Sequence, residues 1–503
     1  MLTNRDLKAK DLDKDLDRLG FVGEAAEAMG RRLTGTGLAV IFLGLCAAVA
    51  ASQIVSGDMS NALILVAASA IAGYMALNIG ANDVANNVAP AVGARVISLT
   101  GALVLAAICE SAGALLGGAD VVSTVSSQIL SPDDVQHNFT FMQAMLTAMA
   151  AAALWINFAT LVGAPVSTTH SIVGGVVGAG VAASGFAAIN WTTVSTIALT
   201  WVASPVLGGM IAAAFMAFIN SRVVYAADRL AAARFWLPIL LGLLGGVFAA
   251  YVSKKTGDRL LDLPDWLSIG LAVLTGLVVW RIYLHVVRKQ TVTQENTARA
   301  VRQLFAIPLM VTAGLLSFAH GANDVANAVG PLAAIVLSQS SDFPDLVFWY
   351  MGALNPVIPL WVSAVGAFGI SAGLLLFGRR LVMVVGKKIT KLSPVRAFCV
   401  TLGAATTVLM ASALGMPVSS THIAVGAVFG VGFYREWHRN RYVTENGRIK
   451  PRKMMRNREE RRRRLLVRRA NLLTIVAAWV VTVPATALFA GALFHLLSLI
   501  FAL

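Results

Sequence analysis

Apolar runs of about twenty residues recur along nearly the whole of this 503-residue chain. A helix needs about twenty such residues to cross the hydrocarbon core of a bilayer. Only 13% of the residues are charged, roughly half the share found in soluble domains. The sequence therefore predicts an all-α polytopic membrane protein rather than a barrel of alternating strands. The apolar segments fall at 36–54, 61–79, 97–118, 141–163, 165–184, 191–218, 236–253, 266–286, 303–338, 346–372, 397–415, 417–434 and 471–500.

The net charge of +15 raises the question of a nucleic-acid partner. The basic residues, however, lie in short stretches between the apolar segments, as residues that anchor loops at a lipid surface do. We therefore expect membrane lipid as a partner and no nucleic acid. Cys46, Cys109 and Cys399 are too scattered for a disulfide framework or a cysteine metal site. No Walker A motif or recognised catalytic motif is present, so we expect neither ATP hydrolysis nor another enzymatic activity.

Loop charges predict how the segments are threaded through the membrane, because Lys and Arg are enriched in cytoplasmic loops. Basic residues concentrate in the loops at 219–234, 287–302, 379–396 and 435–470, whereas 120–140 contains acids and no Lys or Arg. This pattern places residues 1–35 and the four basic loops inside, with 55–60, 120–140 and the C-terminus outside. The loop at 254–264, with Lys254, Lys255 and Arg259, is the one exception.

An acidic motif occurs twice within apolar sequence. GANDVANNVAP spans Gly80–Pro90 and GANDVANAVGP spans Gly321–Pro331, with nine of the eleven positions identical. On the loop assignment, the chain reaches the first motif from outside and the second from inside. Two homologous units of opposite orientation follow, which is the inverted-topology repeat of many secondary transporters.

A second duplicated motif supports this plan. APVSTTHSIVGGVVGAG spans Ala164–Gly180 and MPVSSTHIAVGAVFGVG spans Met416–Gly432. Pro165 and Pro417 suit the first position of a helix, and the glycine two residues before each can end the preceding one. We therefore expect broken helices and re-entrant helical hairpins, whose exposed helix N-termini would cradle an anion. The candidate anion ligands are the hydroxyls of Ser167, Thr168, Thr169, Ser419, Ser420 and Thr421.

The duplicated acids, Asp83 and Asp324, predict a cation-coupling site. A buried Asp can be a structural helix cap, but intramembrane acids are costly and are functional by default. Carboxylate, amide and carbonyl oxygens suit a small hard cation such as sodium. Asn82, Asn86, Asn323 and Asn327 are the neighbouring candidates. No Lys or Arg lies in any of the four motifs, so a bound dianion would require cations or protons to accompany it. The sequence thus predicts symport.

These features divide the chain into seven parts. A polar cytoplasmic segment at 1–35 and an extra N-terminal span at 36–60 precede the first repeat at 61–220. Linking spans and a cytoplasmic loop occupy 221–302, and the second repeat occupies 303–434. A basic cytoplasmic loop at 435–470 and a C-terminal span at 471–503 complete the chain.

With GANDVAN and PVS-S/T-TH each present twice, the chain resembles the inorganic phosphate transporters of the Pit type over roughly residues 61 to 500. The resemblance implies symport of inorganic phosphate with sodium or protons, a multi-pass plasma (inner) membrane location, a homodimer and no cofactor. It implies anion binding by the six hydroxyl residues above. It also implies cation binding by Asn82, Asp83, Asn323 and Asp324, with sodium on the two carboxylates if sodium drives transport.

Several alternatives stay open from the sequence. Glu110, His170 and His422 are candidates for a proton relay or for structural hydrogen-bonding partners. His320 aligns with Ile79 of the first repeat, so the duplication gives it no support. Sulfate is the nearest rival substrate, and a passive anion channel or an intramembrane hydrolase is a rival class.

Overall fold

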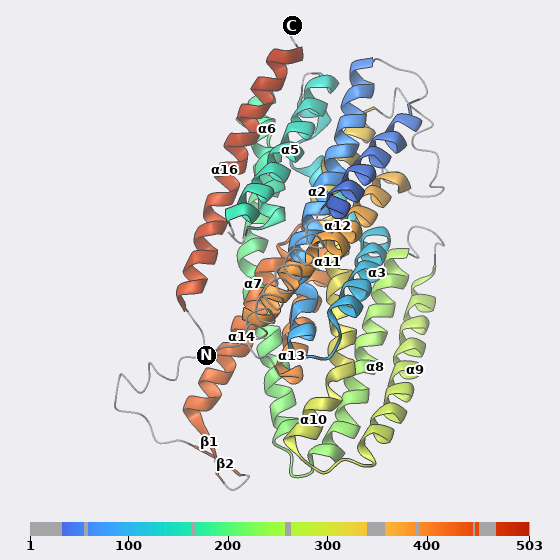
Figure 1. Cartoon of the computed structure of the whole chain (residues 1–503), viewed down its shortest axis with the longest axis vertical. Helices are drawn as coiled ribbons and strands as arrows, with labels where there is room; N and C mark the ends of the chain where they lie inside the picture. The colour runs from blue at the N-terminus through green and yellow to red at the C-terminus, as the bar shows by residue number, and fades with distance from the viewer. Residues whose placement is uncertain are drawn as a thin grey trace, which may run out of the picture.

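The computed structural model describes residues 33–54, 59–135, 137–162, 166–256, 263–339, 358–388, 393–445, 448–451 and 469–501. The described chain is almost entirely helical (Figure 1). The exception is an antiparallel hairpin of β1 (Tyr442–Glu445) and β2 (Arg448–Pro451), which lies beyond the end of the helix labelled α14. The all-α prediction is therefore confirmed, with this short hairpin as an addition.

The α-helices are Leu33–Ser52, α2 (Met59–Gly93), α3 (Leu99–Gly117), α4 (Ala119–Ser123), α5 (Asn138–Val162), α6 (Thr168–Ser184), α7 (Trp191–Ile219), α8 (Arg229–Thr256), α9 (Asp265–Thr291), α10 (Ala298–Leu304), α11 (Ala306–Ser338), α12 (Leu360–Lys388), α13 (Pro394–Ala413), α14 (Ser420–Arg441) and α16 (Arg469–Phe501). Two π-helical turns, η1 (Thr124–Gln128) and η4 (Asn220–Val224), and two 3-10 turns, η2 (Pro132–Asp134) and η3 (Phe186–Ala188), connect them.

Eleven helices in the described part of the chain are long and apolar enough to cross a membrane. The protein is therefore a multi-pass membrane protein, as the apolar runs predicted. The segments predicted at 165–184 and 417–434 form α6 and α14, which do not meet this condition. Both acidic motifs lie inside long unbroken helices, α2 and α11. The helix breaks fall instead before α6 and α14.

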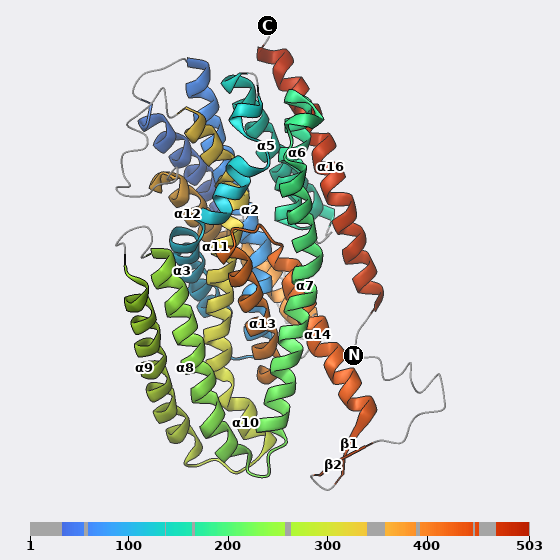
Figure 2. The same ribbon diagram turned by 180° about the vertical axis from the view of Figure 1, so that it is seen from behind.

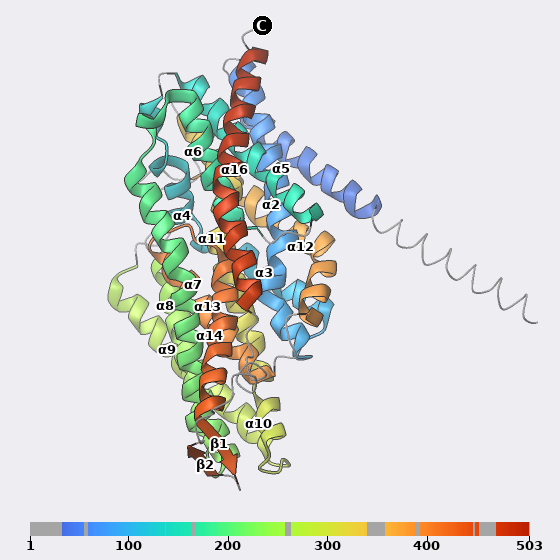
Figure 3. The ribbon, with the colours of Figure 1, turned by 90° about the vertical axis from the view of Figure 1, so that its left-hand side faces the viewer.

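Each motif helix of one half packs along a helix from the other part of the chain. The motif helix α2 of the first half packs along α12 of the second, and α11 of the second half packs along α3 of the first. In the same way α6 packs along α16, and α14 packs along α7 (Figure 2). Figure 3 shows α16 running from the end of the molecule that carries the C-terminus toward its middle, with α14 below it. The opposite orientation of the halves and the residue bounds of the repeats stay predictions.

The first glycine of each acidic motif is required by this packing. A Cβ on Gly80 of α2 would lie 1.9 Å from the carbonyl oxygen of Ile370 on α12. A Cβ on Gly321 of α11 would lie 2.1 Å from the carbonyl oxygen of Glu110 on α3. Small residues let helix backbones approach closely in a membrane, where packing and not hydrophobicity drives association. Each motif therefore begins where its helix touches the other helix of its pair.

The linking helices α8 and α9 form a pair at one edge of the molecule, with α9 outermost (Figures 1 and 2). Large apolar side chains on α9, among them Ile269, Leu274 and Ile282, are exposed. Such a surface is suited to lipid contact. These helices contribute few residues to the centre of the molecule, in keeping with their position between the two halves in the sequence.

Several boundaries of the predicted basic loops are wrong: α8 already begins at Arg229, α9 extends to Thr291 and α14 extends to Arg441. The sequence predicts a basic loop at 379–396, whereas α12 continues through Arg379 and Arg380 to Lys388. Arg and Lys are good helix formers, and their long side chains can extend from a helix end toward water. The predictions made for 1–32, 340–357 and 452–468 lie outside the described residues.

Candidate functional site

The serines of the PVS motifs begin the two hairpin helices. Ser167 Oγ accepts a hydrogen bond from the backbone N–H of His170 at 3.3 Å, and Ser419 Oγ accepts one from the N–H of His422 at 3.3 Å. This is the geometry of a helix N-cap. The sequence placed Pro417 at the first helical position, but α14 begins three residues later, at Ser420. Ser419 is therefore the N-cap and Pro417 lies two residues earlier, in the connecting loop. Its counterpart Pro165 lies outside the described residues.

The two hairpin tips lie against each other. Thr169 Oγ1 on α6 donates a hydrogen bond to the carbonyl oxygen of Val418, next to the start of α14, at 2.9 Å. Beside this contact the ring centroids of His170 and His422 are 4.6 Å apart, and those of His170 and Trp201 are 3.8 Å apart, with the latter two rings tilted by 31°. Two helix N-termini, each with a partial positive charge, are thus brought to one place, as an anion site requires.

Each acidic motif reaches the hairpin of the other half. Asn86 Nδ2 donates to Thr421 Oγ1 at 2.8 Å, and Asn327 Nδ2 donates to Thr169 Oγ1 at 3.0 Å. Thr421 Oγ1 also donates to Asp83 Oδ1 at 3.0 Å. The four duplicated motifs, more than 300 residues apart at their extremes, therefore form a single site.

Each motif also contacts the hairpin of its own half. Ser420 Oγ donates to Asp324 Oδ2 at 3.0 Å, and Thr168 Oγ1 lies 3.4 Å from Asp83 Oδ2. Asn323 accepts from the N–H of Val418 at 3.1 Å and donates to the carbonyl of Met416 at 3.0 Å, so it holds the second hairpin loop. Asn82 is half-buried beside Asp83. The candidate residues of the two acidic motifs therefore lie close together, and Asn323 binds the loop that precedes α14.

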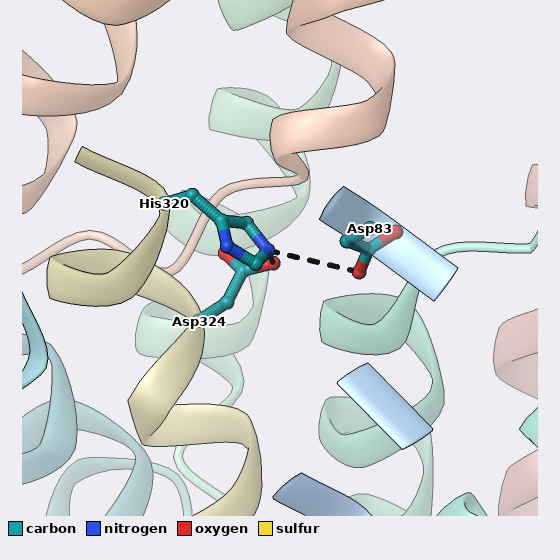
Figure 4. A group of neighbouring side chains, drawn as sticks. All are labelled: Asp83, His320 and Asp324. Carbon is teal, nitrogen blue, oxygen red and sulfur yellow. Dashed lines mark ion pairs between the residues drawn. The ribbon is translucent and has the colours of Figure 1, made fainter. Parts of the chain in front are cut away.

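A histidine that sequence reasoning set aside lies at the centre of the acidic residues. His320 Nε2 is 3.1 Å from Asp324 Oδ2 and 3.9 Å from Asp83 Oδ2, and its Nδ1 is 3.4 Å from Glu110 Oε2. Figure 4 shows the ring next to Asp324 on α11 and facing Asp83 on α2. Asn87 Nδ2 donates to Glu110 Oε1 at 2.8 Å and orients this third carboxylate.

The four-residue spacing between His320 and Asp324 in the sequence places the two side chains together, although the comparison of the two repeats gives His320 no support. Residues four apart share one face of a helix, so His320 must lie beside Asp324 wherever α11 is helical. The first half has Ile79 at this position, which removed the support of duplication. The two acidic motifs are consequently not equivalent, because only Asp324 has a histidine neighbour on its own helix.

The cluster has the donor atoms that a cation needs. One ligand atom each from Asp83, His320 and Asp324 lie within 4.8 Å of one another. Asp324 Oδ1 and Asn327 Oδ1 are buried and accept no hydrogen bond. Buried acceptors without a donor are rare in folded proteins and call for an explanation such as an ion. Carboxylate and amide oxygens are suited to hard cations, so this set of donor atoms fits a sodium ion.

The buried charge is of one sign. In the described ranges the fully buried acids are Asp83, Glu110 and Asp324, and no Lys or Arg is among the buried side chains. Each buried charge costs several kcal/mol unless it is compensated. One imidazole cannot balance three ionised carboxylates, so the cluster requires cations or protons whenever all three acids are charged.

Three kinds of comparison with known proteins each match most of this chain. A family model described as "Phosphate transporter family" matches residues 79–490. A candidate phosphate permease of Helicobacter pylori strain J99 is 46% identical over 399 residues, which are 79% of this chain and 74% of that protein. "Inorganic phosphate transporter 2-1, chloroplastic" of Arabidopsis thaliana is 34% identical over 434 residues, 82% of this chain and 68% of that protein. A solved structure described as "The sodium-dependent phosphate transporter" matches with a TM-score of 0.76 and 36% identity, covering 87% of this chain and all of that one.

Proposed function

Because the chain belongs to the phosphate transporter family, we propose that it is a secondary active symporter that carries inorganic phosphate together with sodium ions by alternating access. The family and the fold make it a transporter and not an enzyme. Phosphate would bind between the hairpin tips, on the hydroxyls of Ser167, Thr168, Thr169, Ser419, Ser420 and Thr421.

The sign of the buried charge is the observation that carries this proposal. Hydrogen phosphate would bring two negative charges to Asp83, Asp324 and Glu110. Two helix N-termini offset only about one unit of charge, and His320 at most one more. Anion binding is therefore unfavourable until cations occupy the donor atoms of Asp83, Asp324 and Asn327. Coupling of the two fluxes follows from this requirement.

The hydrogen bonds of the site suggest how both ions would act on the same movement. Asn86 and Asn327 each join one half of the molecule to the hairpin of the other. Ions bound at these contacts would stabilise the arrangement in which the halves meet. Ligands shift a conformational equilibrium only through such differential contacts. We propose that release on the second side requires these contacts to separate.

Sodium is the proposed driving ion because the similar solved structure, 36% identical, is described as sodium-dependent. Protons are the second candidate, since Glu110 and His320 lie in contact in the same cluster. His170 packs on both His422 and Trp201, which favours a role for the two histidines as structural partners of the hairpins.

Uptake of radiolabelled phosphate into proteoliposomes tests the function directly. We expect accumulation against a gradient when sodium is imposed outside, and its loss when the sodium gradient is collapsed. A pH gradient applied without sodium tests proton coupling, and excess sulfate tests selectivity. Uptake that only equilibrates phosphate, regardless of the ion gradients, would contradict symport and indicate a channel. Inhibition by sulfate as strong as by unlabelled phosphate would contradict phosphate as the preferred substrate.

Removing hairpin hydroxyls is expected to weaken phosphate binding. Thr169→Val and Thr421→Val each preserve side-chain shape but lose one hydroxyl, so the half-saturating phosphate concentration should rise about 10-fold, the effect of about 1.4 kcal/mol. Initial rates of uptake over a range of phosphate concentrations measure this change. Thr200→Val on α7, whose hydroxyl bonds only within its own helix to the carbonyl of Ile197, is the control. An unchanged half-saturating phosphate concentration in both hairpin variants would contradict anion binding at the hairpin tips.

The loop charges support a plasma (inner) membrane orientation with the N-terminus cytoplasmic and the C-terminus outside. The homodimer implied by the resemblance is also a proposal. Cysteine labelling of intact cells at the two faces tests the orientation, and light scattering of the purified protein in detergent tests the oligomeric state.

A further inference from the structure

A polar pocket lies beside the second hairpin and apart from the central site. Its volume is about 610 Å³. It is formed by α4 and η1, the first turn of α7, the end of α8 and the loop that leads into α14. The lining residues are Asp120, Ser123, Thr124, Gln128, Thr192, Thr193, Thr196, Ile197, Lys255, Ala413, Leu414, Gly415 and Met416. Lys255 is the one basic residue among them.

Lys255 is held across the pocket. Its Nζ forms an ion pair with the carboxylate of Asp120 and donates to the carbonyl oxygen of Ala413 at 3.3 Å. Its side chain is 19% exposed. Lys255 belongs to the loop region whose charge contradicts the positive-inside pattern. A charge kept in that position against the general rule, and partly withdrawn from water, indicates a specific role on this face of the protein.

The loop that leads into α14 lies between the pocket and the central site. Thr124 Oγ1 donates to the carbonyl oxygen of Gly415 at 2.7 Å, and Gly415 has a φ of +67°, which favours glycine. The next residue, Met416, accepts a hydrogen bond from Asn323 of the second acidic motif. A group bound in the pocket is therefore separated from the hairpin tip only by this short loop.

We propose that the pocket is an outer binding site for the transported oxyanion, in which Lys255 holds hydrogen phosphate before it reaches the hairpin tips. This inference rests on the proposed function. The hydroxyls of Thr192 and Thr193 on α7, which line the pocket, supply further donors around the anion. A basic group in a recess attracts a dianion and raises its local concentration and arrival rate.

The pairing with Asp120 gives this site the affinity that a transport pathway requires. The arriving anion must compete with the Asp120 carboxylate for the same ammonium group. Binding is consequently strong enough to recruit the anion and weak enough to release it inward, as conduction through successive sites demands. Asp120 also keeps Lys255 neutralised when no anion is present, which limits the cost of partial burial.

Phosphate uptake into intact cells that lack other phosphate transporters tests the outer site, because it samples only the outer face. We expect Lys255→Met to raise the half-saturating phosphate concentration roughly 3- to 10-fold, with little change in the maximal rate. Lys255→Arg, which keeps the charge, should stay near the wild-type value. The matched control is Lys254→Met, the neighbouring lysine, which pairs with the exposed Asp265 and does not line the pocket.

A double variant separates recruitment from a structural role. Lys255→Met leaves the Asp120 carboxylate without this partner, whereas Asp120→Asn combined with Lys255→Met removes both charges. A raised half-saturation that persists in the double variant supports the outer site. A double variant that recovers the wild-type value, or a single variant indistinguishable from Lys254→Met, overturns it. Wild-type cells that take up no phosphate overturn the proposed function as well.

Discussion

Asp83→Asn and Asp324→Asn are each expected to abolish phosphate accumulation while folded protein remains in the membrane. Asparagine preserves the size of the side chain and can still accept the hydrogen bonds from Thr421 and Ser420. It removes the charge that attracts the cation. Loss of several kcal/mol of cation binding in a buried site should lower accumulation on the order of 100-fold.

Sodium-driven uptake into proteoliposomes measures this effect, with the amount of monodisperse protein as the check on folding. Asp265→Asn is the control, because this carboxylate is exposed at the first residue of α9 and forms its ion pair with Lys254 at the surface. The Asp83→Asn and Asp324→Asn variants should differ from each other in their residual exchange of phosphate. The reason is that His320 lies closer to Asp324 than to Asp83. Wild-type accumulation by both variants would refute the coupling argument.

Gly80→Ala and Gly321→Ala are expected to disrupt the folded protein itself. A methyl group at either position would lie about 2 Å from a carbonyl oxygen of the facing helix, Ile370 in one case and Glu110 in the other. The helices must move apart, and overpacking of this severity should cost about 3 kcal/mol or more. Gly321→Ala would also displace Glu110 from His320.

The melting temperature of the purified protein and its elution as a single species measure the loss. Gly270→Ala on α9 is the control, because its added methyl group meets no atom within 4 Å and alanine favours a helix over glycine. We expect Gly270→Ala to be neutral or slightly stabilising. A melting temperature unchanged in both motif variants would show that the helices are not in close contact there.

The spans, the hairpins and the types of ligand in the site were all accessible from the sequence. Apolar runs, the PVS and GAND motifs and their duplication are patterns of neighbouring residues, and such patterns govern whether a helix forms and where it ends. The end of α12 was misplaced because basic residues at a membrane boundary are compatible with either a helix or a loop. The role of His320 was missed because duplication was used as the test of function, and this residue occurs in one half only.

By itself the sequence determined that the chain crosses a membrane repeatedly, and that an acidic motif and a serine-capped hairpin motif occur twice in the same order. Only the tertiary structure decided which of them meet: Asn86 with Thr421, Asn327 with Thr169, and His320 between Asp324 and Glu110. It also placed Lys255 opposite Asp120. The physical reason is that local residues set the path of each helix, whereas contacts between helices depend on how closely backbones can approach, which glycines far apart in the chain control.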